Sequence, residues 1–342
     1  MTKITGYLEI LLEGGDLKYE QAKDLLDTIF KGDVAEVQIA AFLAAMRMKK
    51  AMPSELAGLA QSLRDHAVKI KLSISRDKLI DTCGTGGASL KTFNISTAAA
   101  FVAAGAGAYV AKHGNRAITS KCGSADVLEA LGVKIDCSPD VVAECIEKAR
   151  IGFMFAPLYH PAMKFVQPIR KSLDFRTAFN ILGPLANPAG VTSQVMGVAE
   201  EGLLDRIADT LKILGAKRAM VVHGGGLDEI SLTAATKIVE IKGEQKTSYE
   251  IRPSDFGFAP PKMAELVGGS TEHNATLVKD VICGKNKGSA RDIVLLNAAA
   301  AIMVAGLAED LRSGIRKAAE AIDSKAAADC LEKMIEISNK KV

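Results

Sequence analysis

The chain changes character once, near residue 72, and this change constrains the fold more than any other feature. Before it, apolar residues recur at spacings of three and four, as in residues 37–46, which is typical of amphipathic helices. Four short helices fit this part, with Asp33 and Ser54 expected as helix caps. After it, β-branched runs, glycine-rich loops and alanine-rich helices alternate, which favours an α/β domain. We therefore predict a small helical domain at residues 1–71, followed by a larger α/β domain.

A proline-rich segment at residues 157–188 predicts a further passage of the chain between the two domains. One helical stretch is expected there, from about Pro168 to Leu182, and Gly-Pro and Asn-Pro breaks follow it. We expect about residues 165–188 to join the helical domain. The α/β domain would then comprise residues 72–164 and 189–342.

Charge and composition exclude several function classes for the chain as a whole. Its 342 residues carry a formal net charge of only +3, aromatic residues make up 5%, and tryptophan is absent. This gives no general electrostatic case for nucleic acid or an anionic membrane, and it leaves few rings on which bases could stack. Six scattered cysteines without a CxxC pair, and an amino end without an apolar signal core, favour a cytoplasmic protein with reduced thiols. Any anion must therefore bind at a local site.

Two adjacent features after the first expected strand are typical of phosphate binding. Three glycines fall within residues 84–87, where a backbone turn can present its N–H groups to an anion. Asn94, Ser96 and Thr97 then stand at the start of an alanine-rich helix, whose unpaired N–H groups and dipole favour phosphate. The alternative is a plain turn followed by an ordinary helix cap. The density of hydroxyl groups favours phosphate.

A second loop, within residues 110–126, also suits a polyanion. It runs from an expected strand end into a helix and holds Lys112, Arg116 and Lys121 together with an imidazole, an amide and several hydroxyls. Loops after the carboxyl ends of strands are where open α/β sheets bind ligands. The alternative is a solvated basic loop, and Ser124 taken alone suits a helix cap as well as a ligand contact.

Two further segments carry charged groups that suit a small-molecule site. Arg170 could bind a carboxylate through two hydrogen bonds, although spacing alone slightly favours an exposed helix with ordinary basic residues. Asp228 and Glu229 follow an apolar strand and a glycine turn, and hard oxygen ligands of this kind suit Mg²⁺ beside a phosphate. Taken alone, an adjacent acidic pair is more often an ordinary surface feature. His223, just before the turn, is interpreted as structural.

The motifs GTGG, NIST, KHGNR, GSAD, YHPAMK, FNILGPLANP and GGGLDE occur in this order, and with them the chain resembles the anthranilate phosphoribosyltransferase family. The resemblance extends from the leading helices to about residue 320. It implies a homodimer in which each subunit has a small helical domain hinged to an α/β domain, a fold shared with nucleoside phosphorylases. It also implies Mg²⁺-dependent reaction of phosphoribosyl pyrophosphate with anthranilate, which yields phosphoribosylanthranilate and pyrophosphate in tryptophan biosynthesis.

The resemblance also assigns residues. Mg²⁺ would contact Ser96, Asp228 and Glu229, and anthranilate would contact Gly84, His113, Asn115, His160 and Arg170. The catalytic group would be Lys112, Arg170, Asp228 and Glu229. Phosphoribosyl pyrophosphate would be held by Gly84, Gly87, Ala88, Thr92, Asn94, Ile95, Ser96, Thr97, Lys112, His113, Gly114, Asn115, Arg116, Ala117, Ile118, Thr119, Ser120 and Ser124.

Two positions depart from the family pattern. Ala88 stands where the family usually has the aspartate of GTGGD, so a carboxylate that would help to organise metal or ribose is absent. Asp174 replaces a usual glycine, which we expect to be a lesser change inside a helix.

Charge indicates how such a site would act. Negative charge develops on the departing pyrophosphate, so Mg²⁺, Lys112 and backbone N–H groups would stabilise the transition state. The aromatic amine is a neutral nucleophile at pH 7, so its placement by Arg170 and Asn115 would count for more than a general base.

Two other functions stay open at this point. A pyrimidine nucleoside phosphorylase also binds phosphate at a glycine-rich loop, but it needs one phosphate rather than a pyrophosphate with Mg²⁺. A non-catalytic relative that binds nucleic acid would account for the missing aspartate at Ala88. The low net charge and the intact Asp228-Glu229 pair argue against this second possibility.

Overall fold

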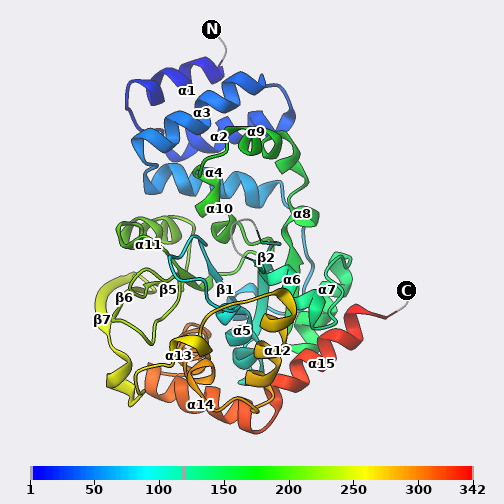
Figure 1. Ribbon diagram of the computed structural model, residues 1–342. Coiled ribbons are helices and arrows are strands. Elements are labelled where there is room, and N and C mark those ends of the chain that lie inside the picture. Colours follow the sequence, from blue (N-terminus) through cyan, green and yellow to red (C-terminus); the bar gives the residue numbers. More distant parts are fainter. Residues whose placement is uncertain (1–2, 118–120, 341–342) are drawn as a thin grey trace.

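Four helices precede the first strand, as the sequence predicts, and they form the layer at the top of Figure 1. The computed structural model describes residues 3–117 and 121–340. Within these residues no helix is long and apolar enough to cross a membrane. The four helices are α1 (Lys3–Leu12), α2 (Tyr19–Lys31), α3 (Glu36–Lys49) and α4 (Pro53–Asp65).

The expected caps of this layer are wrong, because neither Asp33 nor Ser54 precedes a helix directly. Helix α4 is instead held by the buried Glu55. One carboxylate oxygen of Glu55 accepts a hydrogen bond from the N–H of Met52 at 2.7 Å, and the other accepts one from the N–H of Leu17 at 2.9 Å. A carboxylate that ties the start of one helix to the loop before another does the work of a local cap.

A seven-stranded sheet lies below this layer, with the strand order β3-β2-β1-β4-β5-β6-β7. The first five strands of this order are parallel, and β6 and β7 join as an antiparallel hairpin at one edge. Along the chain the order reverses between β1 and β4, and in open α/β sheets such a reversal leaves a crevice at the carboxyl ends of the strands. The strands are β1 (Leu79–Gly84), β2 (Tyr109–Gly114), β3 (Ile151–Phe155), β4 (Ser193–Gly197), β5 (Arg218–His223), β6 (Thr236–Lys242) and β7 (Gln245–Ile251).

Helices cover both faces of the sheet. Because successive side chains of a strand point to opposite faces, each strand packs against helices on both sides. Met220 and Val222 of β5 belong to the apolar core under α5 and α13, whereas Ala219 and Val221 belong to the core shared with α11 and the helical layer. The remaining helices are α5 (Ile95–Gly105), α6 (Ser124–Ala130), α7 (Pro139–Ala149), α8 (Ala156–Tyr159), α9 (Gln167–Leu173), α10 (Phe179–Leu185), α11 (Leu204–Ile213), α12 (Thr271–Ile282), α13 (Ser289–Val304), α14 (Leu311–Asp323) and α15 (Ala326–Ser338).

The architecture confirms the predicted class, a small helical part and a larger α/β part. The domain boundaries themselves stay a prediction. One continuous apolar core runs from α1–α4 through α9 and α10 to α11 and one face of β4–β6, so packing alone does not divide the chain at residue 72 or at residues 165–188.

The expected helix from Pro168 to Leu182 is wrong, because the chain breaks into α9 and α10. The break lies at Asp174, whose φ of 49° is in the left-handed region. Asp174 therefore does not sit inside a helix as expected. It ends one, in a conformation that glycine adopts without a steric penalty and that aspartate adopts more readily than most residues.

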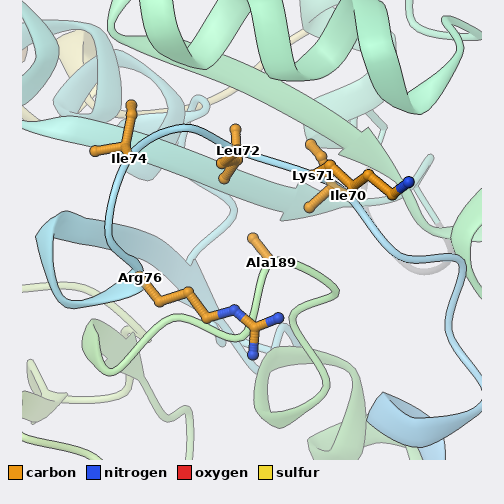
Figure 2. A pocket seen from close by; sticks show the side chains of 6 residues that line it. All are labelled: Ile70, Lys71, Leu72, Ile74, Arg76 and Ala189. Carbon is orange, nitrogen blue, oxygen red and sulfur yellow. The ribbon is translucent and has the colours of Figure 1, made fainter.

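Two stretches of chain link the helical layer to the sheet and run beside each other, as Figure 2 shows. Ile70, Leu72 and Ile74 come from the first stretch and Ala189 from the second, and they line a hollow of about 230 Å³. Arg76, which also lines it, begins the short 3-10 turn Arg76–Lys78 that leads into β1. The hollow therefore lies at the amino end of β1, roughly 17 Å from the carboxyl end of that six-residue strand.

Candidate active site

The carboxyl ends of β1 and β4 meet in Gly84 and Gly197, which are register partners in the sheet. The acidic loop, residues 224–230 after β5, lies directly on both glycines. A Cβ atom at Gly197 would fall 1.6 Å from the carbonyl oxygen of Asp228, and one at Gly84 would fall 2.4 Å from its Oδ2. Backbone contact therefore restricts Gly197 to glycine, and a side chain at Gly84 would displace the Asp228 carboxylate.

Asp228 and Glu229 face the two phosphate-binding features predicted from the sequence. Asp228 Oδ2 accepts a hydrogen bond from the N–H of Gly86 at 2.8 Å, and Glu229 Oε1 accepts one from the N–H of Ser96 at 3.2 Å. Burial raises the pKa of Asp228. Burial, together with the neighbouring Asp228, raises the pKa of Glu229 to about 8. Two carboxylates that resist ionisation side by side form a site that favours a bound cation.

The chemistry of these donors fits Mg²⁺ rather than a metal held entirely by protein. Among residues 3–117 and 121–340, no three His, Cys, Asp or Glu side chains converge as a metal-binding group. Mg²⁺ is often bound by one or two carboxylates and completes its coordination with water and substrate phosphates. Asp228 and Glu229 supply the carboxylates. Ser96, whose N–H donates to Glu229, supplies a hydroxyl.

The glycine loop, residues 84–89, continues from β1. Gly86 and Gly87 have φ values of 67° and 88°, which turn their backbone sharply after the strand. Arg176 packs on this turn. Its Nη2 donates to the carbonyl of Gly86 at 3.3 Å, and a Cβ atom at Gly87 would fall 1.9 Å from its Nη1. The charge of Arg176 also lowers the pKa of Asp228, against the larger effect of burial.

The sequence prediction did not include Arg176 or Gly197 in the site. Arg47 of α3 donates a hydrogen bond to the carbonyl of Arg176, so the helical layer reaches the glycine loop through this residue. A glycine that ends an apolar strand, as in the segment SQVMG, is the signal that could have indicated Gly197. No comparable pattern marks Arg176.

Helix α5 begins with Ile95, and residues 90–94 connect it to the glycine loop. The side chain of Asn94 is used in packing, since its Nδ2 donates to the carbonyl of Cys122 at 3.3 Å and its Oδ1 accepts from Asn274 at 3.0 Å. Ile95 is fully buried. The buried Thr97 hydroxyl lacks a hydrogen-bond partner within the described residues. The N–H groups of Ile95, Ser96 and Thr97 are paired with Phe93, Glu229 and Asn94. This first turn therefore offers the hydroxyls of Ser96 and Thr97 rather than the Asn94 amide.

Other predicted residues of these loops have structural contacts. Thr92 forms an isolated antiparallel bridge with Val267, and Ala88 is nearly buried, with its carbonyl accepting from Lys91 Nζ at 2.9 Å. In His223, which the sequence predicts to be structural, both ring nitrogens are occupied. Nδ1 meets the Val198 carbonyl at 2.9 Å, and Nε2 accepts from the N–H of Gly226 at 3.2 Å.

Lys112 lies beneath the site rather than on its surface. The residue is 2% exposed, and its Nζ donates to the carbonyl of Thr82 at 2.6 Å. Burial raises the pKa of the neighbouring Asp81 to about 6, and the charge of Lys112 opposes that rise. The same charge lowers the pKa of Glu229 against burial. Asn187 completes this buried network by donating to Asp81 Oδ2 at 2.8 Å.

In the basic loop after β2, the charge of Arg116 is paired within the protein. Arg116 is exposed and paired with Asp126 at 2.9 Å and with Glu129 at 2.8 Å, so its guanidinium faces α6. Asp126 Oδ2 also accepts from the N–H of Ala117 at 2.9 Å, which fixes the backbone of the loop. The predicted residues Ile118, Thr119 and Ser120 lie outside the described part of the chain.

Ser124 is the first residue of α6 rather than its cap, which is Gly123. Its Oγ donates to the carbonyl of Asn115 at 3.3 Å, and a Cβ atom at Gly114 would fall 2.2 Å from that Oγ. Asn115 is exposed, and its side-chain oxygen accepts from the N–H of Arg116 at 2.8 Å.

Two buried histidines lie where the sheet meets the helical layer. The rings of His113 and His160 are 5.0 Å apart and meet edge to face. Burial lowers the pKa of His113 to about 3 and that of His160 to about 4, so both are neutral at pH 7. His113 Nε2 and both ring nitrogens of His160 form no well-shaped hydrogen bond within the described residues, and neither does the buried Thr177 hydroxyl. Backbone groups of Gly183 near His113, and of Leu63 and Ala186 near His160, raise these pKa values against the larger effect of burial.

Arg170 is on α9, at the helical side of the same region. Its Nη1 donates to Gln167 at 3.1 Å, and its guanidinium lies 5.4 Å from the ring centre of Phe179. Burial lowers the pKa of Arg170. The described contacts do not link it directly to the carboxylate pair.

Comparison with known proteins decides the family. A model described as "Glycosyl transferase family, a/b domain" matches residues 76–328, and one described as "Glycosyl transferase family, helical bundle domain" matches residues 5–67. The anthranilate phosphoribosyltransferase of Methanocorpusculum labreanum is 50% identical over 326 residues, which cover 95% of each chain. The chain belongs to the anthranilate phosphoribosyltransferase family.

Solved anthranilate phosphoribosyltransferases have the same fold. The enzyme from Thermus thermophilus is 38% identical with a TM-score of 0.92, and the match covers 97% of this chain and 99% of that one. The enzyme from Saccharomyces cerevisiae, in complex with phosphoribosyl pyrophosphate and Mg, is 28% identical with a TM-score of 0.87 and coverage of 98% and 97%. The same yeast enzyme was also solved with 4-fluoroanthranilate, at 26% identity, a TM-score of 0.85 and coverage of 98% and 97%. The resemblance found in the motifs is therefore confirmed across the whole chain.

Proposed function

We propose that the chain transfers the phosphoribosyl group of phosphoribosyl pyrophosphate to the amine of anthranilate, giving phosphoribosylanthranilate and pyrophosphate in tryptophan biosynthesis. The observation that carries the proposal is the position of Asp228 and Glu229. They lie at the switch point of the sheet, with one carboxylate against the glycine loop and the other against the first turn of α5. The family membership and the substrates bound in the yeast relative support the same reaction.

The donor side would work by charge. Mg²⁺ held by Asp228, Glu229 and Ser96 would neutralise charge on the pyrophosphate as it leaves. The backbone N–H groups of Gly87 and Ala88 in the glycine loop would bind phosphate oxygens, together with the hydroxyls of Ser96 and Thr97 at the start of α5. Lys112 would act through space from its buried position in β2, since its own hydrogen bond goes to the carbonyl of Thr82.

The acceptor side would work by placement. Anthranilate has an aromatic ring, a carboxylate and a neutral amine. The neutral rings of His113 and His160 suit its ring and amine, and Arg170 suits its carboxylate. Asn115 at the end of β2 would contact it from the sheet side. We propose no general base for the attack itself, because the neutral amine attacks C1 as the bond to pyrophosphate breaks, and the new amine then releases its proton to pyrophosphate or water. The low pKa values of His113 and His160 make both rings weak bases.

The remaining assignments made from the resemblance stay proposals. Gly84, Gly87, Ala88, Thr92, Ile95, Thr97, Gly114, Arg116, Ala117 and Ser124 would contribute backbone or hydroxyl contacts to phosphoribosyl pyrophosphate, and Ile118, Thr119 and Ser120 belong to the same proposal. A cytoplasmic location also stays a prediction.

We further propose a homodimer that forms through the outer surface of the helical layer. Leu12 of α1 is 68% exposed, and Val37 and Met48 of α3 are 77% and 85% exposed. Val37 and Met48 are 11 residues apart, which is three helical turns, so they share one face of α3. Large apolar side chains exposed on the same face of a helix indicate a protein contact. A Val37→Glu, Met48→Glu variant should sediment as a monomer where the natural chain sediments as a dimer. An unchanged sedimentation coefficient would contradict this surface.

The decisive experiment follows the loss of anthranilate fluorescence when purified protein, phosphoribosyl pyrophosphate and increasing Mg²⁺ are mixed. We expect Mg²⁺-dependent turnover that disappears in an Asp228→Ala, Glu229→Ala variant. A variant of the exposed Glu309, Glu309→Ala, is the control and should behave as the natural chain does. Absence of turnover at every Mg²⁺ concentration would contradict the proposed function.

A further inference from the structure

Helix α13 is buried along most of its length, and its side chains there are mainly alanine and branched aliphatic residues. Asn297 lies in the middle of this stretch with only 3% of its surface exposed. A buried amide is costly unless its polar atoms are paired, so its partners indicate why it is there.

The amide of Asn297 is paired with the acidic loop. Oδ1 accepts the N–H of Ile230 at 2.9 Å, and Nδ2 donates to the carbonyl of Ile230 at 2.8 Å. Nδ2 also donates to the carbonyl of Ile293, one turn earlier in α13, at 2.9 Å. Both donor hydrogens and the acceptor oxygen are therefore used. One side chain satisfies both backbone groups of Ile230, as a neighbouring strand would.

Ile230 directly follows Glu229, so this contact is one of the points that fix the carboxylate pair. On the other side, Gly197 and Gly84 allow Asp228 to lie directly on the ends of β4 and β1. Gly224 closes the loop, because a Cβ atom there would fall 2.4 Å from the carbonyl oxygen of Glu229. The ends of β1 and β4 thus contact the acidic loop on one side, and the Asn297 amide contacts it on another.

We propose that Asn297 is a positioning residue for the reaction. It holds the backbone after Glu229 so that the Asp228 and Glu229 carboxylates keep the spacing that a divalent cation bound to a diphosphate ester requires. The proposal rests on the proposed function, because that function assigns the cation to this pair. It adds a residue that lies 67 positions after Ile230 in the sequence and that would contact neither substrate nor metal.

The physical reason is the narrow geometry of the cation. Mg²⁺ requires near-ideal octahedral distances, so small shifts of a carboxylate weaken its binding. Without the amide, the buried N–H and C=O groups of Ile230 would lack partners, and the loop would move to pair them elsewhere. Groups that orient metal ligands typically change metal affinity or activity by about 10-fold to 100-fold when removed.

The test uses isothermal titration calorimetry of phosphoribosyl pyrophosphate in excess Mg²⁺, together with the Mg²⁺ dependence of kcat and KM. Asn297→Leu removes the amide at similar volume, and Asn297→Ser is a milder change in case the first variant fails to fold. We expect both variants to weaken binding by at least tenfold and to raise the Mg²⁺ concentration for half-maximal turnover. The KM for anthranilate should stay within about twofold.

The control is Leu296→Ala, a fully buried neighbour on the same helix. It should lower the melting temperature without weakening binding, which separates positioning from general stability. An Asn297 variant that folds and binds phosphoribosyl pyrophosphate as the natural chain does would overturn the inference. Failure of the proposed function would be distinguishable, because the natural chain itself would then show no Mg²⁺-dependent turnover.

Discussion

Replacement of Gly197 by alanine tests whether the close approach of Asp228 to β4 matters for function. The added Cβ atom would fall 1.6 Å from the carbonyl oxygen of Asp228, whereas real contacts of this kind essentially never fall below 3.0 Å. The acidic loop must therefore move by about 1.4 Å, the difference between these two distances. The backbone of Gly197 is not in the left-handed region, so alanine introduces no conformational strain of its own.

The expected cost falls on both catalysis and folding. A misplacement of about 1 Å can lower the rate by about 100-fold, which corresponds to about 2.7 kcal/mol of transition-state stabilisation. Overpacking of this kind typically lowers the free energy of unfolding by about 1–3 kcal/mol. We therefore expect Gly197→Ala to remain folded and to lose turnover at least 100-fold in the anthranilate fluorescence assay, with a higher requirement for Mg²⁺.

Gly202→Ala is the matched control, because a Cβ atom at Gly202 would meet no atom within 4 Å. Circular dichroism and thermal unfolding would show that both variants are folded at the assay temperature. If Gly197→Ala kept the kcat and KM of the natural chain, the acidic loop would not be fixed by contact with β4, and the reasoning would be refuted.

Three further variants test other parts of the site. Because burial raises the pKa of Glu229 to about 8, its protonated form stabilises the metal-free fold, and this stability is lost as pH rises through 8. In EDTA at pH 9, Glu229→Gln should therefore unfold at a higher urea concentration than the natural chain, and near pH 4 the two should unfold at similar urea concentrations. The variant should nevertheless lack Mg²⁺-dependent turnover. Equal unfolding midpoints at pH 9 would contradict the raised pKa. Arg170→Ala should raise the KM for anthranilate by about 10-fold to 100-fold and leave that for phosphoribosyl pyrophosphate nearly unchanged, and a reversed pattern would place Arg170 on the donor side. Arg176→Ala should raise the KM for phosphoribosyl pyrophosphate by several fold, because the variant removes the cation that packs on the glycine loop; identical kinetics would show that Arg176 only fills space.

The sequence predicted the elements of this fold well where the signal is local. Spacings of three and four gave the four leading helices, and β-branched runs followed by glycine gave β2 and β5. The glycine loop and the pair Asp228 and Glu229 were also predicted as parts of one site, because carboxylates beside a phosphate suit Mg²⁺ and because the family resemblance assigned both to it. Their hydrogen bonds within the described residues agree with that expectation.

Features that depend on a single dihedral angle or on a distant partner were not predictable. Arg170 and Arg176 looked like residues of one helix, because the glycine that the family usually has at Asp174 was interpreted as a helical position rather than as a left-handed one. The amide of Asn297 and the backbone of Ile230 are 67 residues apart. Their pairing arises only when α13 packs against the loop after β5, so no spacing rule could have indicated it.

The two cations of the KHGNR motif show why residue type alone does not assign a role. Lys112 lies within β2, a strand with neighbours on both sides and helices over both faces, so its side chain is buried whichever face it takes. Its charge then acts on Asp81 and Glu229 from below. Arg116 lies beyond the end of the same strand, where the chain turns outward, and its charge is taken up by Asp126 and Glu129. A motif read as one polyanion site thus separates into a buried electrostatic support and an exposed anchor for the loop, because the strand ends between them.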